Sequence, residues 1–256
     1  MHKNLIQLVK SLAKHNFISP INIARLRYLY ILHKWPHFKH PKDLNEKINY
    51  LKFYGNTSLW PKLSDKYAVR KYIEDFGLGE ILVKLYGKWD SVDDIDWDKL
   101  PNQFVMKCNN GSGDVLVCHD KATLDIDKYK QYFDLMLHRK FGIINGEPHY
   151  MKIKPCIIAE ELLNANTQPC GSTSLIDYKI WCFNGKPHSI FVVLNRSRES
   201  ANCGIYDLNW QYRPEFLRFT NHKIYFGELT FTSQGGCMDY FSQQYLNETG
   251  ALIKLH

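Results

Sequence analysis

The sequence predicts an α+β fold of two lobes, preceded by a helical N-terminal segment. Apolar residues recur at helical spacing near the N-terminus, and helices then alternate with short strands along the rest of the chain. The 256 residues are 45% hydrophobic and 23% charged, which excludes intrinsic disorder as the main state. No apolar run reaches the ~18 residues of a membrane-spanning helix, and no signal-peptide core follows Met1, so we expect a cytoplasmic protein.

The cysteines and the net charge narrow the classes of partner. Seven cysteines include no Cys-x-x-Cys pair, which argues against a zinc ribbon or a disulfide framework and favours reduced thiols. The net charge of +7 favours anionic partners such as phosphates, nucleotides, acidic glycans or lipid. Because no RNA-binding sheet signature or zinc finger is present, no nucleic-acid partner is expected.

Residues 1–60 form the predicted helical segment. The spacing predicts helix over 4–32 with a break at 16–20, and a further helix through Phe53 that begins at Asp43 or Asn45 as its cap. The first helix is basic and amphipathic, so packing on the body of the protein and lying on an anionic membrane both remain open.

Residues 61–155 are the predicted lobe that carries a glycine loop, and residues 156–256 a shortened C-terminal lobe. In the first lobe we expect a helix at 64–73 capped by Ser64, strands at 81–85, 104–107 and 115–118, a helix at 129–139 and a loop at 142–148. In the second we expect strands at 156–161, 175–183, 189–194 and 223–231, with a hairpin turn at Asn184-Gly185.

The glycine loop is the most informative segment. It joins two predicted strands and contains Asn109, Asn110, Gly111, Ser112 and Gly113. Such a loop frees backbone N–H groups to face an anion, and Lys107 adds a positive charge just before it. A plain tight hairpin is the alternative, since neither a Walker nor a Rossmann glycine pattern is present.

Carboxylates on the later strands add to this pattern. Glu160 and Glu161 end an apolar strand, where they would meet the adenine and ribose of a nucleotide, or simply lie exposed. Asp177 and Lys179 share one strand face, where they either contact a ligand or pair with each other. Glu228 lies within an apolar strand, which favours a metal or a cation as its partner unless it faces outward.

Taken together, these blocks resemble the ATP-grasp superfamily, and specifically its TupA-like branch of teichuronopeptide and capsular polysaccharide biosynthesis. The matching blocks lie at 44–47, 64–70, 100–107, 109–113, 157–161, 177–185 and 226–231. The resemblance implies two α+β lobes with ATP between them, and ATP-dependent ligation of a carboxylate to an amine or a thiol. The expected substrates are a nucleotide and a glycan or amino-acid acceptor, and association with a membrane or an assembly complex is left open.

The resemblance also implies residue roles. Lys107 would bind the α- and β-phosphates, the loop from Asn109 to Gly113 would cover them, and Glu160, Glu161 and Asp177 would contact the nucleotide. Lys179 and Arg196 would act near the γ-phosphate and the acyl phosphate, and Glu228 would bind Mg²⁺.

One stretch departs from the family pattern. The family has a long helix and an Arg-Val-Asp strand, with the other metal ligand, between the strands of Arg196 and Glu228, and this chain has no room for them. Thr230 also stands where a magnesium-binding Asn is usual. An internal deletion before the last strand therefore leaves a degenerate or inactive module of the same pathway as one alternative. A glycosyltransferase is another, although the Asp-x-Asp strings at 94–98 and 125–127 suit helix capping better.

Overall fold

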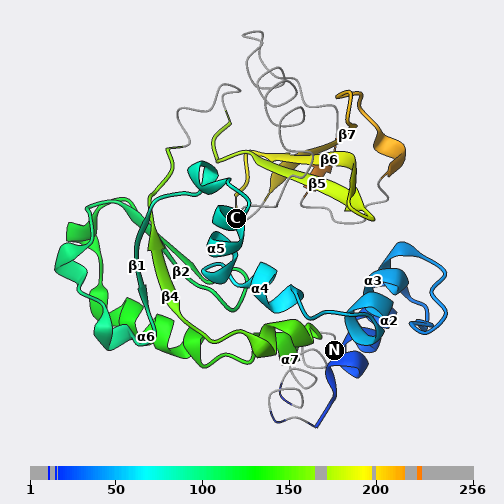
Figure 1. Ribbon diagram of the computed structural model, residues 1–256, viewed down its shortest axis with the longest axis horizontal. Helices are drawn as coiled ribbons and strands as arrows, with labels where there is room; N and C mark the ends of the chain where they lie inside the picture. Colours follow the sequence, from blue (N-terminus) through cyan, green and yellow to red (C-terminus); the bar gives the residue numbers. More distant parts are fainter. Residues whose placement is uncertain are drawn as a thin grey trace. The chain divides into compact units, whose positions relative to one another are not determined.

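The structure is a computed structural model that describes residues 11, 15, 17–164, 172–197, 200–216 and 224–226. The chain divides into two compact units, Met1–Leu162 and Leu163–His256. Helices and two largely antiparallel sheets occur in one chain, which is the predicted α+β class (Figure 1).

Six helices of the first unit are described. They are α2 (Pro20–Leu32), α3 (Leu44–Tyr54), α4 (Trp60–Ser64), α5 (Ala68–Asp75), α6 (Ile126–Leu137) and α7 (Phe141–Asn145). Pro20 suits the first turn of α2, because that position needs no N–H donor. Asp43 caps α3 by accepting a hydrogen bond from the Glu46 backbone N–H at 2.9 Å, so it is the cap rather than Asn45. The earlier part of the predicted 4–32 helix lies largely outside the described residues.

Three local predictions in the first unit are wrong. Ser64 ends α4 instead of capping the next helix, whose N-cap is Tyr67, and Asp65 accepts from the N–H groups of Tyr67 and Ala68 just before that helix. The strand expected at 81–85 begins only at Leu85. The loop expected at 142–148 is mostly helix α7, whose last turn ends at Gly146 in the left-handed conformation (φ 67°).

The first unit contains a four-stranded antiparallel sheet. Its strands are β1 (Leu85–Trp89), β2 (Phe104–Cys108), β3 (Val115–Cys118) and β4 (Ile157–Glu160), in the spatial order β1-β4-β2-β3. The glycine loop joins β2 to β3, as predicted. Strand β4 lies at the start of the predicted C-terminal lobe, but it pairs with β1 and β2 and so belongs to this sheet.

One face of this sheet builds the main core of the unit. Phe104 and Met106 of β2 are fully buried and pack with Phe133 of α6, which contacts the strand. Figure 1 shows α6 running alongside the sheet. Strand β2, which carries Lys107, lies between β4 and β3 and is thus an inner strand of the sheet.

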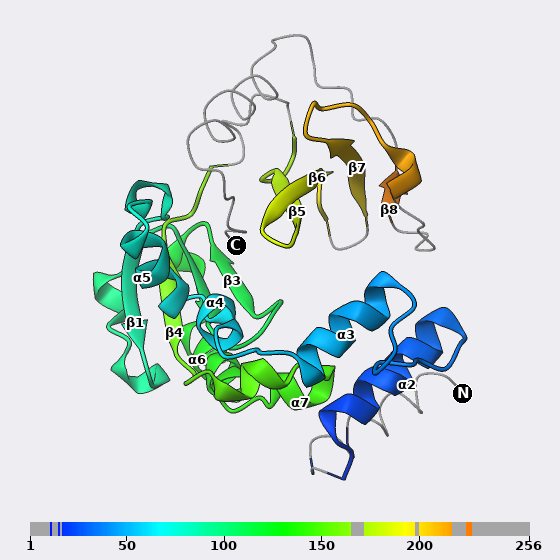
Figure 2. The ribbon, with the colours of Figure 1, turned by 45° about the vertical axis from the view of Figure 1, so that its right-hand side comes forward.

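The second unit contains a separate four-stranded sheet. Its strands are β5 (Asp177–Phe183), β6 (Lys186–Leu194), β7 (Ala201–Asp207) and β8 (Ile224–Phe226), in that spatial order (Figure 2). The predicted hairpin is confirmed, since Asn184 and Gly185 have φ values of 52° and 77°, which such a tight turn requires. Strand β8 pairs parallel with β7, and the predicted strand beyond Phe226 lies outside the described residues.

Two further predictions concern membrane-spanning helices and disulfides, and the described part of the chain bears on both. None of its helices has the length and apolar character required to cross a membrane. The five cysteines within it, at positions 108, 118, 156, 182 and 203, form no disulfide, in line with the predicted reduced thiols.

Candidate functional site

A buried carboxylate between two cations lies at the centre of the first unit's site. Glu160 ends β4 and is 7% exposed. Its Oε1 accepts from Arg70 Nη1 at 3.0 Å, and its Oε2 contacts Lys107 Nζ. Lys107 lies opposite Ile158 in the strand register, so Glu160 is its diagonal neighbour on the same sheet face. The carboxylate of Glu160 is thereby fixed beside Lys107. Of the two glutamates that were predicted either to contact a nucleotide or to lie exposed, Glu161 is exposed and Glu160 is buried.

Asn109, which we expected to cover a ligand, has an amide that joins three segments of the chain. Its Nδ2 donates to Asp65 Oδ1 at 2.9 Å and to the Lys154 carbonyl at 3.0 Å. Its Oδ1 accepts from the Cys156 N–H at 2.7 Å. Because all the polar atoms of the amide are used, Asn109 positions the loop, while its neighbours Ser112 and Gly113 are exposed.

Two further contacts shape the glycine loop. Lys66 Nζ donates to the Gly111 carbonyl, and Asp114 pairs with Arg139 at 2.8 Å. A Cβ on Gly111 would lie 2.6 Å from Asp114 Oδ2, so only glycine fits there with this pair in place. Gly113 has φ +85°, a backbone conformation that favours glycine.

The electrostatics around the loop favour an anion. Burial lowers the pKa of Lys66, and the positive charge of Lys107 lowers it further. Two lysines that repel one another beside exposed loop residues gain from a negatively charged ligand, because its charge offsets both the desolvation and the repulsion. A triphosphate has this chemistry, so the residues fit a bound nucleotide.

The second unit brings together three residues from the sequence prediction. Asp177 Oδ2 accepts from Lys179 Nζ at 2.9 Å and also contacts the Arg196 guanidinium. Asp177 and Lys179 lie two residues apart on β5, and Arg196 follows the end of β6. The carboxylate therefore pairs with Lys179, as one alternative predicted, and it also holds a second cation on the same side of the sheet.

The predicted magnesium site is not placed by these residues. Glu228 and Thr230 lie outside the described residues. Within the part of the chain that is described, no three His, Cys, Asp or Glu side chains gather as a metal site would require. We therefore assign no Mg²⁺ ligand there and derive no step through the ion.

A lysine beside a glycine loop in the first unit, and the cluster of Asp177, Lys179 and Arg196 in the second, are the features expected of an ATP-grasp protein. The family model described as TupA-like ATPgrasp matches residues 46–215 of the 256, and the chain belongs to this family. The match includes Lys107, Glu160, Asp177, Lys179 and Arg196, and it ends before Glu228. No curated protein and no solved structure matches the chain.

Four residues of the first unit's site were not singled out from the sequence. Lys66 and Arg70 lie within the block at 64–70 that carried the resemblance, and Asp114 and Arg139 follow the glycine loop. Arg70 also donates to the Val83 carbonyl at 2.6 Å, so it is held in place from two sides. The only local signal for Arg70 was its position four residues after Lys66. Its partner, Glu160, lies 90 residues away in the sequence.

Proposed function

We propose that the chain is an ATP-dependent ligase of cell-surface polysaccharide biosynthesis, which joins an amine or amino acid to a carboxylated sugar. The observation that carries this proposal is the group of Lys66 and Lys107 around a loop with exposed glycine backbone, in a chain of the TupA-like ATP-grasp family. We place the reaction in the cytoplasm, where ATP is available.

The proposed reaction has two steps. A sugar carboxylate oxygen attacks the γ-phosphorus of ATP, the bond to the β-phosphate oxygen breaks, and ADP leaves an acyl phosphate behind. The amine nitrogen then attacks the carbonyl carbon, loses its proton and expels inorganic phosphate. Positioning and neutralisation of charge drive such phosphoryl transfer, so no protein nucleophile is needed.

We assign roles on that basis. Lys107 binds the α- and β-phosphates, and the loop backbone at Gly111–Gly113 covers them through N–H groups. Lys179 and Arg196 offset charge on the transferred group, and Asp177 holds these two cations in position. Bound Mg²⁺ would supply further neutralisation of the phosphates, with Glu228 as its proposed ligand.

The test is ADP release by the purified chain with MgATP, a panel of uronic acids and a panel of amines and amino acids. We expect ADP release that requires both a uronic acid and an amine, and that falls at least tenfold in Lys179→Met. ATP binding without ADP release on any pair of acceptors would contradict the ligase proposal and support the degenerate module.

The glycosyltransferase alternative has less support. Asp125 caps α6 by accepting from the Lys128 N–H at 3.0 Å, so one Asp-x-Asp string has the capping role expected of it. Binding of a UDP-sugar in preference to ATP, measured by calorimetric titration of each nucleotide, would favour this alternative over the ligase.

A further inference from the structure

A groove of about 260 Å³ lies between α2, α3 and α7, and no residue of the glycine loop lines it. Arg27 lies on its α2 wall, Lys52, Asn45 and Asn49 on its α3 wall, and Glu147 follows α7. The volume is slightly below the usual ~300–1,000 Å³ of pockets for drug-sized ligands, which suits a group the size of one sugar ring.

We propose that this groove binds a carboxylated sugar unit of the glycan substrate. The proposal deepens the proposed function, on which it rests for the idea that the substrate is a glycan. The charge and the hydrogen-bonding groups of the groove are properties of its lining residues and do not depend on that function.

The first argument is an uncompensated positive charge. Lys52 is half-buried in the groove, and none of the described carboxylates forms an ion pair with it. Burial lowers the pKa of Lys52, the charge of Glu147 raises it, and the charge of Arg27 lowers it. Two cations and one carboxylate leave a net positive charge, so a ligand carboxylate is attracted here.

The second argument is an unsatisfied hydrogen-bond acceptor. Asn49 Oδ1 is buried and has no hydrogen-bond partner, whereas Asn49 Nδ2 donates to the Asn45 carbonyl at 2.8 Å. A buried acceptor without a donor is unfavourable, and a rotation of the Asn49 side chain on binding exposes it to a ligand hydroxyl, which then supplies the missing donor. A carboxylate beside hydroxyl groups is the combination that a uronic acid offers.

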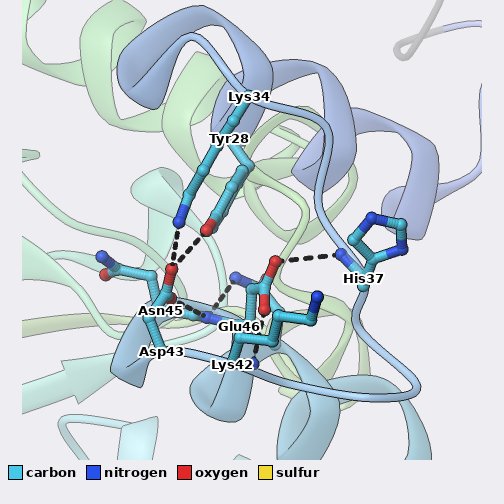
Figure 3. A network of polar contacts seen from close by, with 8 residues as sticks. Tyr28, Lys34, His37, Lys42, Asp43, Asn45 and Glu46 are labelled. Atoms are coloured by element: carbon cyan, nitrogen blue, oxygen red, sulfur yellow. Dashed lines mark hydrogen bonds and ion pairs between the residues drawn. The ribbon is translucent and has the colours of Figure 1, made fainter.

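The third argument is that the walls are fixed before a ligand arrives. Tyr28 Oη donates to Asp43 Oδ2 at 2.6 Å, and Lys34 Nζ reaches the same oxygen at 2.7 Å, which ties α2 to the start of α3 (Figure 3). Arg27 Nη1 donates to the carbonyl and Oδ1 of Asn145, at 3.0 and 3.1 Å, which ties α2 to α7. Preorganised walls reduce the entropy lost on binding.

The fourth argument is the position of the groove relative to the glycine loop. At one end of α7, Phe141 packs against the loop, since a Cβ on Gly111 would lie 3.5 Å from Phe141 Cδ2. At the other end, Asn145 lines the groove. These two residues are about 6 Å apart along a helix with a rise of 1.5 Å per residue. The groove and the loop are therefore contacted by the two ends of the same short helix.

The experiment is an NMR titration of the ¹⁵N-labelled full chain with glucuronate. Glucose serves as the neutral analogue with the same ring, and glutamate as a carboxylate without the ring. We expect glucuronate to shift amide signals of α3 and α7, with an affinity at least tenfold above that for glucose or glutamate. Lys52→Met should weaken glucuronate binding at least tenfold, while Lys47→Met, on an exposed position of the same helix, should leave it unchanged.

Four results would overturn the proposal. They are no shifts at α3 and α7 at 100 mM glucuronate, equal binding of glucose, binding of glutamate as tight as that of glucuronate, and retention of affinity in folded Lys52→Met. Thermal unfolding of both variants establishes that they are folded, and Asn49→Leu serves as a second groove variant if Lys52→Met does not fold. Lys107→Met should lose MgATP binding and keep glucuronate binding, so failure of the groove and failure of the nucleotide site are distinguished.

Discussion

Lys107 and Glu160 are diagonal neighbours on adjacent antiparallel strands, and the Glu160 carboxylate joins Lys107 to Arg70 in a buried group of three charges. The side chains of Arg70 and Glu160 are only 14% and 9% exposed, and that of Lys107 is 10% exposed. The lysine that we propose to bind phosphate is thus held in place by a carboxylate from the neighbouring strand.

This group of charges makes Glu160 important for stability. Glu160→Ala leaves two buried cations without their anion, so we expect a loss of about 3–5 kcal/mol in the free energy of unfolding. Urea denaturation measures the change. Glu161→Ala, at the exposed neighbouring position, should alter the free energy by no more than about 0.5 kcal/mol. Equal effects of the two substitutions would contradict the assigned ion pairs.

The glycine loop gives a second prediction. Gly111→Ala places a Cβ against Asp114 and displaces it from Arg139, so we expect a loss of stability of about 1–3 kcal/mol together with weaker MgATP binding. Calorimetry and urea denaturation measure the two effects. Ser112→Ala, at an exposed loop position, is the matched control and should retain stability. A Gly111→Ala variant with unchanged stability would show that the loop is not packed as described.

The network at the start of α3 predicts a pH dependence. Burial alone would raise the pKa of Asp43, but hydrogen bonds from Lys34 and Tyr28 outweigh it and lower the pKa from 3.8 to about 2. Because the folded pKa lies below the ordinary value, the network stabilises the fold fully above about pH 4, and its contribution is lost as the pH falls toward about 2.

Asp43→Asn keeps an oxygen for the helix cap but removes the charge. The variant should therefore lose less unfolding free energy than the wild type between pH 4.5 and pH 2.5. Urea denaturation at both pH values gives the comparison, and Asp93→Asn, at an exposed position, should behave as the wild type. An unchanged pH dependence in Asp43→Asn would refute the network's role.

The ion pairs of Asp177 in the second unit predict a substitution that affects kcat more than the KM for ATP. Asp177→Asn removes the charge that holds Lys179 and Arg196, so we expect kcat for ADP release to fall at least tenfold while the KM for ATP changes less than threefold. Steady-state kinetics measure both constants. Glu215→Gln, an exposed carboxylate of the same unit, should leave both unchanged. A rise in KM with unchanged kcat would place Asp177 in ground-state binding instead.

Local patterns allowed part of the fold to be predicted. Strands β2 and β3 and the β5–β6 hairpin follow from apolar runs and the Asn184-Gly185 turn, which depend on neighbours in sequence. Helix α7 was missed because its residues are helical through contacts with α2 and the 3₁₀ turn after it, which no local pattern announces. The place of β4 in the first sheet depends on pairing with strands far away in the sequence.

The same division applies to the candidate site. Lys107 and the glycine loop were predicted because their chemistry is contiguous in the sequence. Arg70 escaped notice because its role depends on a carboxylate on another strand, and the structural role of Asn109 depends on Lys154 and Cys156. Residue type alone does not separate an amide that binds a ligand from one that closes a loop.

The central claim is that Lys107 and its glycine loop form the nucleotide site, and calorimetric titration of MgATP into the full chain tests it most directly. Wild-type protein and Lys128→Met, a variant at an exposed position on α6, should bind MgATP with equal affinity, whereas Lys107→Met should bind at least a hundredfold more weakly. Equal affinity in folded Lys107→Met, or no binding by the wild type, would contradict the account.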